Sequence, residues 1–148
     1  MKILYTAEAT ASGGRNGISR TPDGNMEVRL VPPVELGGPG GEGTNPEQLF
    51  ALGYAGCFDN ALLLIAAGKK LNADDSSVTA RVAFGPLEDR PGWGLAVTLR
   101  VELPHLDQET AQRLVERTDK ACPYSNAVRG NIPLEFEVHA GSALAAPA

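Results

Sequence analysis

The strongest constraint on the fold of this sequence is a long apolar segment with a clear helix start. Residues 45–48, Asn-Pro-Glu-Gln, supply an N-cap amide, a proline at the first helical position, an acid in the first turn and a capping-box glutamine. From Leu49 to Ala67 the apolar residues run almost all the way round the helix. The helix is expected to end at residues 68–70, Gly-Lys-Lys. Because a helix that is apolar on every side is normally buried, we expect this helix to be central to the fold.

Alternating apolar and polar residues predict β-strands on both sides of this helix. The predicted strands cover residues 3–11, 18–20, 26–30, 78–84, 95–103 and 132–138. A second helix is expected to begin after the cap Asp107 and to end at Cys122, just before Pro123. The order β-β-β-α-β-β-α-β predicts an α+β fold, with antiparallel sheets packed around the central buried helix.

Length and composition indicate one globular domain. The 148 residues are enough for a single hydrophobic core, and we predict a domain over residues 1–139 followed by a disordered, alanine-rich tail over 140–148. Hydrophobic residues make up 43% and charged residues 21%, which excludes a wholly disordered chain. The net charge is −5, and no basic cluster is present, so binding to nucleic acid or to an acidic membrane surface is not expected.

Targeting signals are not evident in the sequence. No stretch approaches the run of about 18 consecutive apolar residues that a membrane span needs. The first residues, Met-Lys-Ile-Leu-Tyr-Thr-Ala-Glu, lack the long apolar core of a secretion signal. We therefore expect a cytoplasmic protein.

The two cysteines, Cys57 and Cys122, are the most reactive side chains in the sequence. In a reducing cytoplasm they are either inert buried thiols or a redox pair, and their number alone favours the inert interpretation. Within an apolar helix and beside Phe58, the Cys57 thiol is expected to have a raised pKa. It becomes a nucleophile only if a fixed positive charge lies nearby. Taken singly, Arg15 and Glu47 are equally well explained as a surface charge and a helix-start acid.

Other motifs give weaker signals. Residues 38–43 match the dinucleotide-binding pattern G-x-G-x-x-G, but two prolines stand where its preceding strand should be, so a flexible loop is expected. Residues 53–57 suggest a nucleophile elbow, but Asp59 stands in place of the required glycine. His105 and His139 do not have zinc-ligand spacing relative to the cysteines. No metal site and no cofactor are therefore expected.

Several ordered segments resemble the organic hydroperoxide resistance proteins, a branch of the OsmC-like family. The segments that carry the resemblance are residues 4–7, 13–17, 35–38, 44–51, 53–58 and 122–131. The last of them contains Cys-Pro-Tyr-Ser-Asn-Ala, which favours this branch over other OsmC-like proteins. The resemblance extends from Leu4 to about Val138, and Asp59-Asn60 and the alanine-rich tail depart from it.

The resemblance implies a cysteine-based peroxidase that protects against oxidative stress. Cys57 matches the peroxidatic cysteine and Cys122 the resolving cysteine, while Arg15 and Glu47 match the family's site arginine and glutamate. Organic hydroperoxides, including those of fatty acids, would be reduced to alcohols through a Cys57 sulfenic acid and a Cys57–Cys122 disulfide. A dithiol, in this family a lipoyl group, would then reduce the disulfide. We expect Arg15 to lower the pKa of Cys57, and Glu47 to orient Arg15.

The spacing of these residues bears on the oligomeric state. If residues 46–67 form one straight helix, Glu47 and Cys57 are separated by about 15 Å along its axis. A shared site then needs a helix break near Gly53 or a second subunit, and the family's intertwined homodimer supplies the latter. Two alternatives remain open: an OsmC-like peroxidase that is less selective for organic peroxides, and a non-catalytic thiol redox sensor or binding module.

Overall fold

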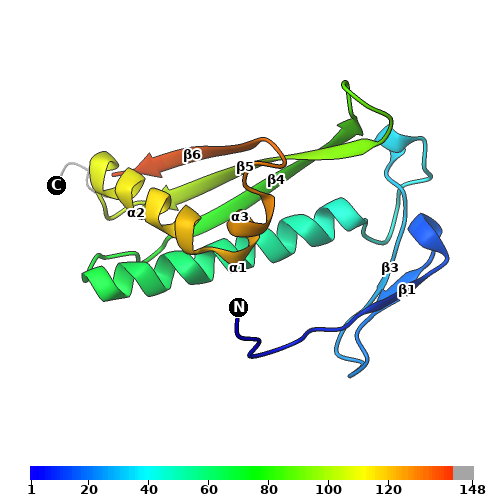
Figure 1. Ribbon diagram of the computed structural model, residues 1–148, viewed down its shortest axis with the longest axis horizontal. Coiled ribbons are helices and arrows are strands. Elements are labelled where there is room, and N and C mark those ends of the chain that lie inside the picture. The colour runs from blue at the N-terminus through cyan, green and yellow to red at the C-terminus, as the bar shows by residue number, and fades with distance from the viewer. Residues whose placement is uncertain (142–148) are drawn as a thin grey trace. The chain divides into compact units, whose positions relative to one another are not determined.

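The computed structural model describes residues 1–141. Contacts within the chain define two compact units, Met1–Leu49 and Phe50–Ala148. The first unit contains three short strands, and the second contains a three-stranded sheet with helices against it (Figure 1). The α+β architecture with two small sheets and a long helix agrees with the fold class predicted from the sequence.

The first unit is an antiparallel meander. Its strands are β1 (Thr10–Ser12), β2 (Ile18–Arg20) and β3 (Glu27–Arg29), paired in the order β1-β2-β3. Two 3-10 helices, η1 (Gly14–Asn16) and η2 (Val34–Leu36), lie in its loops. The expectation of a strand over residues 3–11 is mostly wrong, since only its end pairs with β2. Alternating apolar and polar residues are not enough to form a strand where no neighbouring strand is available for pairing. Accordingly, the side chains of Ile3, Leu4 and Tyr5 are all at least 70% exposed.

The long helix α1 (Pro46–Lys69) begins where the sequence predicted. The backbone N–H of Gln48 donates to the Asn45 side-chain oxygen at 2.8 Å. Its burial differs from the prediction, because only one side of the helix is covered within the chain. The buried residues of α1 are Tyr54, Phe58, Ala61, Leu62 and Ala66.

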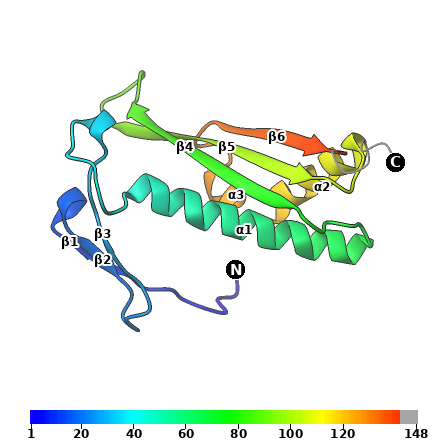
Figure 2. The same cartoon turned by 180° about the vertical axis from the view of Figure 1, so that it is seen from behind.

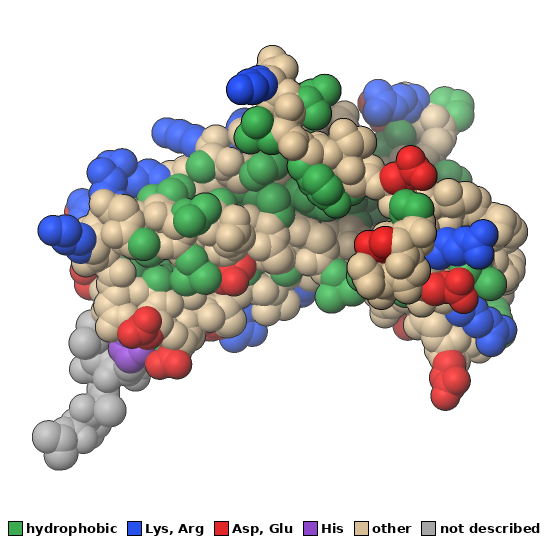
Figure 3. All heavy atoms as spheres, turned by 90° about the horizontal axis from the view of Figure 1, so that it is seen from below, with side chains coloured by type: hydrophobic (Ala, Val, Ile, Leu, Met, Phe, Trp, Pro, Cys, Tyr) green, Lys and Arg blue, Asp and Glu red, His purple; other side chains and the backbone are tan. Residues whose placement is uncertain are grey.

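The opposite side of α1 is apolar but exposed. Leu52 and Leu64 are 70% and 67% exposed, and Leu63 is 43% exposed. Figure 3 shows apolar side chains on the side of the second unit that α1 forms. By length and composition alone α1 is also able to cross a membrane, a property that the core helices of soluble proteins share.

The sheet of the second unit is mixed rather than antiparallel. Its strands are β4 (Ser77–Pro86), β5 (Trp93–Leu103) and β6 (Leu134–Ala140), with β5 in the middle (Figure 2). The pair β4–β5 is antiparallel as expected, but β6 runs parallel to β5. Helices α2 (Gln108–Ala121) and α3 (Pro123–Val128) connect β5 to β6, and a helical crossover is the usual connection between parallel neighbours.

One face of this sheet carries the core. Alternation in β5 predicts that Leu95, Val97, Leu99 and Val101 face inward; the last three are buried and Leu95 is partly buried, and Leu103 is buried as well. Helix α2 begins at its predicted cap, with the Thr110 backbone N–H donating to Asp107 at 2.9 Å. Its predicted inner face is also buried, and α1 contributes to the same cluster. Strand β6 continues to Ala140, and most of the predicted tail, residues 142–148, lies outside the described residues.

Candidate functional site

The two cysteines lie together in the second unit. Cys57 is half-buried on α1, and Cys122 is fully buried between α2 and α3. Their sulfur atoms are 3.7 Å apart, and both thiols are free. A disulfide needs an S–S distance of about 2.05 Å, so a small local movement suffices to join them.

Local sequence explains how Cys122 reaches this position. Its backbone N–H still donates to the Thr118 carbonyl at 2.8 Å, which makes it the last hydrogen-bonded residue of α2. Pro123 then occupies the first position of α3, where its fixed φ suits a helix start. The chain therefore turns at Cys122, and the buried thiol lies at the corner between two helices.

The surroundings of Cys57 favour the neutral thiol. Burial raises the pKa of Cys57, and the neighbouring Cys122 raises it further. The backbone N–H of Tyr124 acts in the opposite direction and lowers this pKa by hydrogen bonding to the sulfur. The groups of this unit thus leave the thiol with a pKa above its ordinary value, as the sequence predicted for a cysteine in an apolar helix.

The first unit holds an ion pair with two parallel hydrogen bonds. The Arg15 Nη1 and Nη2 atoms donate to Glu47 Oε2 and Oε1 at 2.8 and 2.6 Å. Hydrogen bonding from Arg15 lowers the pKa of Glu47, and the same contact raises the pKa of Arg15. The Arg15 side chain is 37% exposed and the Glu47 side chain 14%. The structure therefore brings together the two charged residues of the predicted site, while their roles in catalysis remain predictions.

A glycine-rich turn holds Arg15 in place. Arg15 lies in η1, between β1 and β2. A Cβ atom on Gly17 would lie 1.7 Å from the Ser12 carbonyl oxygen, so only glycine fits where the turn closes. Glu47 lies in the first turn of α1, which fixes the other half of the pair.

Buried hydroxyl side chains lie about one helical turn from each thiol, and neither Tyr54 nor Ser125 was predicted as a site residue. The Tyr54 hydroxyl is hydrogen-bonded to the Ser125 hydroxyl at 2.8 Å, and both side chains are buried. The Tyr54 ring lies 6.1 Å from that of Phe50 and 5.6 Å from that of Tyr124. Helical spacing was the available signal, because Tyr54 precedes Cys57 by three residues and therefore lies on the same face.

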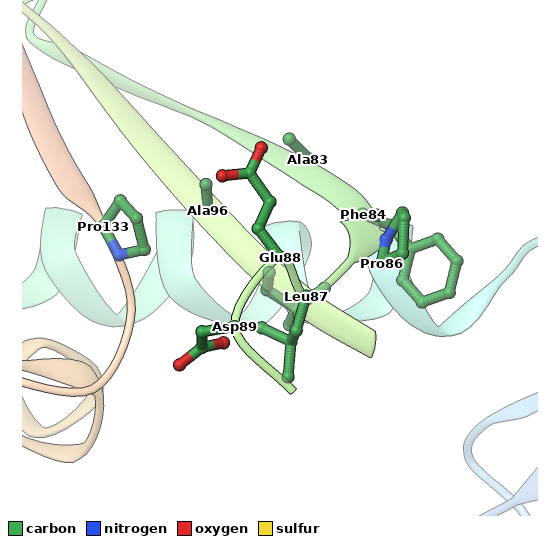
Figure 4. A pocket seen from close by; sticks show the side chains of 11 residues that line it. Ala83, Phe84, Pro86, Leu87, Glu88, Asp89, Ala96 and Pro133 are labelled. Atoms are coloured by element: carbon green, nitrogen blue, oxygen red, sulfur yellow. The ribbon is translucent and has the colours of Figure 1, made fainter. Parts of the chain in front are cut away.

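A cavity of this chain lies apart from the predicted site residues. Its volume is about 570 Å³, and it lies at the end of the β4–β5 hairpin, where Glu88, Asp89 and Pro133 are among its lining residues (Figure 4). None of the four predicted site residues lines it. Within residues 1–141, no three His, Cys, Asp or Glu side chains are grouped so that they could hold a metal ion.

Known proteins resemble this chain along most of its length. The family described as OsmC-like protein matches residues 38–137. The organic hydroperoxide resistance protein of Xanthomonas axonopodis pv. citri is 48% identical over 132 residues, which cover 88% of this chain and 92% of the relative.

Solved structures agree with this relationship. An organic hydroperoxide resistance protein from Elizabethkingia anophelis, crystallised with thiocyanate bound, has a TM-score of 0.89 and 44% identity, covering 95% of this chain and 99% of its own. A putative organic hydroperoxide resistance protein from Vibrio cholerae, with captopril bound in one of its active sites, has a TM-score of 0.86 and 46% identity, covering 93% and 94%. The chain therefore belongs to the OsmC-like family, within its organic hydroperoxide resistance branch.

Proposed function

We propose that this protein is a thiol peroxidase that reduces organic hydroperoxides, including those of fatty acids, to alcohols. The observation that carries the proposal is the 3.7 Å separation of two free cysteines in a member of the organic hydroperoxide resistance branch. Cys57 is the more accessible of the two thiols, so it is the one that meets the peroxide. The buried Cys122 is in position to react only with Cys57.

The reaction follows from the chemistry of two neighbouring thiols. The Cys57 thiolate attacks one oxygen of the hydroperoxide, the O–O bond breaks, and the other oxygen leaves as the alkoxide and takes up a proton. Cys57 becomes a sulfenic acid. The Cys122 sulfur then attacks the Cys57 sulfur, the S–O bond breaks, and water is released as the disulfide forms. A dithiol regenerates both thiols by exchange and is itself oxidised to a disulfide.

In this proposal the Arg15–Glu47 pair supplies a positive charge to Cys57, whose pKa is raised by burial and by Cys122 in its own unit. A guanidinium beside the sulfur stabilises the thiolate and can also donate hydrogen bonds to the peroxide. A carboxylate alone would oppose thiolate formation. We therefore assign Glu47 the role of holding Arg15 in one orientation, which the two parallel hydrogen bonds support.

A homodimer brings the two pairs together in this proposal. Helix α1 is unbroken from Pro46 to Lys69, so Glu47 and Cys57 are ten residues apart on one helix, about 15 Å along its axis. We propose that one subunit supplies Arg15 and Glu47 and the other supplies the two thiols. The exposed leucines Leu52, Leu63 and Leu64 give α1 an apolar side that a second copy would cover.

The electron donor and the location complete the proposal. We propose a dihydrolipoyl group, free or protein-bound, as the dithiol, because a small dithiol can reach a half-buried disulfide and close its own ring on oxidation. We place the enzyme in the cytoplasm, where thiols are kept reduced.

Steady-state turnover tests the proposal. Cumene hydroperoxide and dihydrolipoamide are supplied together, and the native protein is compared with Cys57→Ser. We expect many turnovers per subunit for the native protein and none above background for the variant. A native protein that reacts once and then stops would instead support a non-catalytic redox sensor. Turnover of hydrogen peroxide as fast as that of cumene hydroperoxide would indicate a less selective peroxidase.

A further inference from the structure

Among the contacts that join α1 to the segment beginning at Cys122, two are made by side chains at matching positions. One is the contact of the two thiols, with sulfur atoms 3.7 Å apart. The other is the hydrogen bond between the Tyr54 and Ser125 hydroxyls, at 2.8 Å. Tyr54 lies three residues before Cys57, and Ser125 lies three residues after Cys122. The hydrogen bond is therefore about one helical turn from the cysteine on each side.

This hydroxyl pair lies in a buried and tightly packed environment. The exposed fractions of Tyr54 and Ser125 are both 0%, so water does not compete for their hydrogen bond. The rings of Phe50 and Tyr124 lie against Tyr54. A Cβ atom on Gly53 would lie 2.7 Å from the Tyr124 hydroxyl oxygen, which shows how closely α3 approaches α1. In such a place an unpaired hydroxyl is unfavourable, and its hydrogen bond fixes the spacing between the two helices.

We propose that Tyr54 and Ser125 are positioning residues, whose hydrogen bond holds Cys122 at the distance needed to attack the oxidised Cys57. This inference rests on the proposed function for its biological meaning. The step concerned is resolution of the sulfenic acid: the S–O bond of Cys57 breaks, the Cys57–Cys122 bond forms, and the hydroxyl leaves as water with the proton of Cys122. The initial attack on the peroxide does not need Cys122 and therefore does not depend on this spacing.

Tyr54→Phe and Ser125→Ala test the inference, because the first keeps the ring and the second removes only an oxygen. One equivalent of cumene hydroperoxide is added to the reduced protein, and hydroperoxide loss and disulfide formation are followed separately. We expect hydroperoxide loss at the native rate and disulfide formation slowed about fivefold to tenfold, the effect of losing one buried hydrogen bond. Dimedone, which traps sulfenic acids, should label more Cys57 in the variants than in the native protein.

Thr118→Val is a matched control for loss of a buried hydroxyl. Thr118 is also 0% exposed, but its hydroxyl donates within α2, to the Leu114 carbonyl at 2.8 Å. Disulfide formation in this variant should keep the native rate. The double variant Tyr54→Phe/Ser125→Ala should be no slower than the slower single variant, since one hydrogen bond is lost in each case. Native rates in both single variants, or an equal slowing by Thr118→Val, would overturn the inference.

A second oxidant separates this inference from the proposed function. Diamide accepts two electrons and two protons from a pair of thiols and leaves them as a disulfide, without any hydroperoxide. Slower disulfide formation in Tyr54→Phe with diamide supports the positioning role even if the native protein reduces no hydroperoxide. If Tyr54→Phe does not fold, Ser125→Ala decides the question. Native rates with diamide in the folded variants would contradict the positioning role even if the native protein is an active peroxidase.

Discussion

The two units of the chain hold their reactive groups in opposite ways. In Phe50–Ala148 the thiols lie beside a hydrophobic core formed by α1, α2 and the mixed sheet. In Met1–Leu49 the Arg15–Glu47 pair is held by a glycine-rich turn and a helix start, and Leu30 is the only buried hydrophobic residue described. The thiol geometry is thus set by packing within one unit. The geometry of the charged pair is set by local backbone structure, in a unit with little core of its own.

The predicted effects of mutation follow this difference. Changes at the thiols should remove chemistry while leaving the charged pair unaffected. Changes at the charged pair should weaken the chemistry with little effect on the core.

The largest effect is expected at Cys57. Cys57→Ser should lower peroxide turnover by on the order of 10³-fold or more, because a hydroxyl is a far weaker nucleophile than a thiolate at neutral pH. Cys122→Ser should instead keep the first reduction and lose the disulfide, which mass spectrometry detects as sulfenic and sulfinic acid on Cys57. Equal loss of the first turnover in both variants would contradict the division of roles.

The next effect is expected at Arg15. Arg15→Ala should lower the rate of hydroperoxide reduction by about 10²-fold, as for loss of one preorganised charged donor. The pH at which Cys57 reacts with a thiol reagent should rise in this variant, and the unfolding midpoint should change little. Arg20→Ala is the control, because Arg20 is an exposed arginine on the neighbouring strand β2. A normal rate in Arg15→Ala would remove the ion pair from the mechanism.

A smaller effect is expected at Gly53. Gly53→Ala should destabilise the protein by about 1 kcal/mol, because the new methyl group would displace the Tyr124 ring. Gly68→Ala is the matched control on the same helix, since nothing lies within 4 Å of its added Cβ. That variant should be stabilised by about 0.5–1 kcal/mol through helix propensity. Urea unfolding measures both, and a stabilised Gly53→Ala would show that α3 does not restrict this side of α1.

The smallest effect is the pH dependence of stability at Glu47. Arg15 lowers the pKa of Glu47 in the folded chain, so the stabilisation is present above the ordinary carboxyl pKa. It should be lost as the pH falls from that value to the lowered one. Because Arg15 is partly exposed, we expect less than about 1 kcal/mol. Urea midpoints between neutral and acidic pH should fall more steeply for the native protein than for Glu47→Gln, and parallel curves would contradict the pairing in solution.

Local structure was largely predictable from the sequence because its signals are local. The cap at Asn45, the cap at Asp107 and the alternation of β5 each depend on residues within one turn or one strand, and all three appear in the structure. The direction of β6 was predicted wrongly, although the helix expected between Asp107 and Cys122 was the available signal for a crossover. Alternation assigns a strand and its inward face, but only the crossover through α2 and α3 determines whether it runs parallel to β5.

The residues of the site were also predicted better than their arrangement in space. The resemblance named Cys57, Cys122, Arg15 and Glu47, but no spacing in the sequence places two cysteines 3.7 Å apart. The apolar circumference of α1 predicts a buried helix that needs a partner surface, and within one chain only one side of it is covered. An apolar pattern predicts that a surface is buried, but it does not predict whether the same chain or a second chain buries it. The Tyr54–Ser125 hydrogen bond was missed because a tyrosine in an apolar helix has the pattern of an ordinary core residue.

Mixed dimers test whether one subunit's ion pair serves the other subunit's thiols. Arg15→Ala and Cys57→Ser chains are coexpressed with different tags, and the mixed dimer is purified and assayed with cumene hydroperoxide and dihydrolipoamide. Each mixed dimer would contain one complete site, so it should recover about half the native activity, whereas Arg15→Ala alone keeps about 1% and Cys57→Ser alone none above background. Cys57→Ser mixed with Cys122→Ser should recover none, because both thiols of a site come from one chain. A mixed Arg15→Ala/Cys57→Ser dimer without activity would contradict the account.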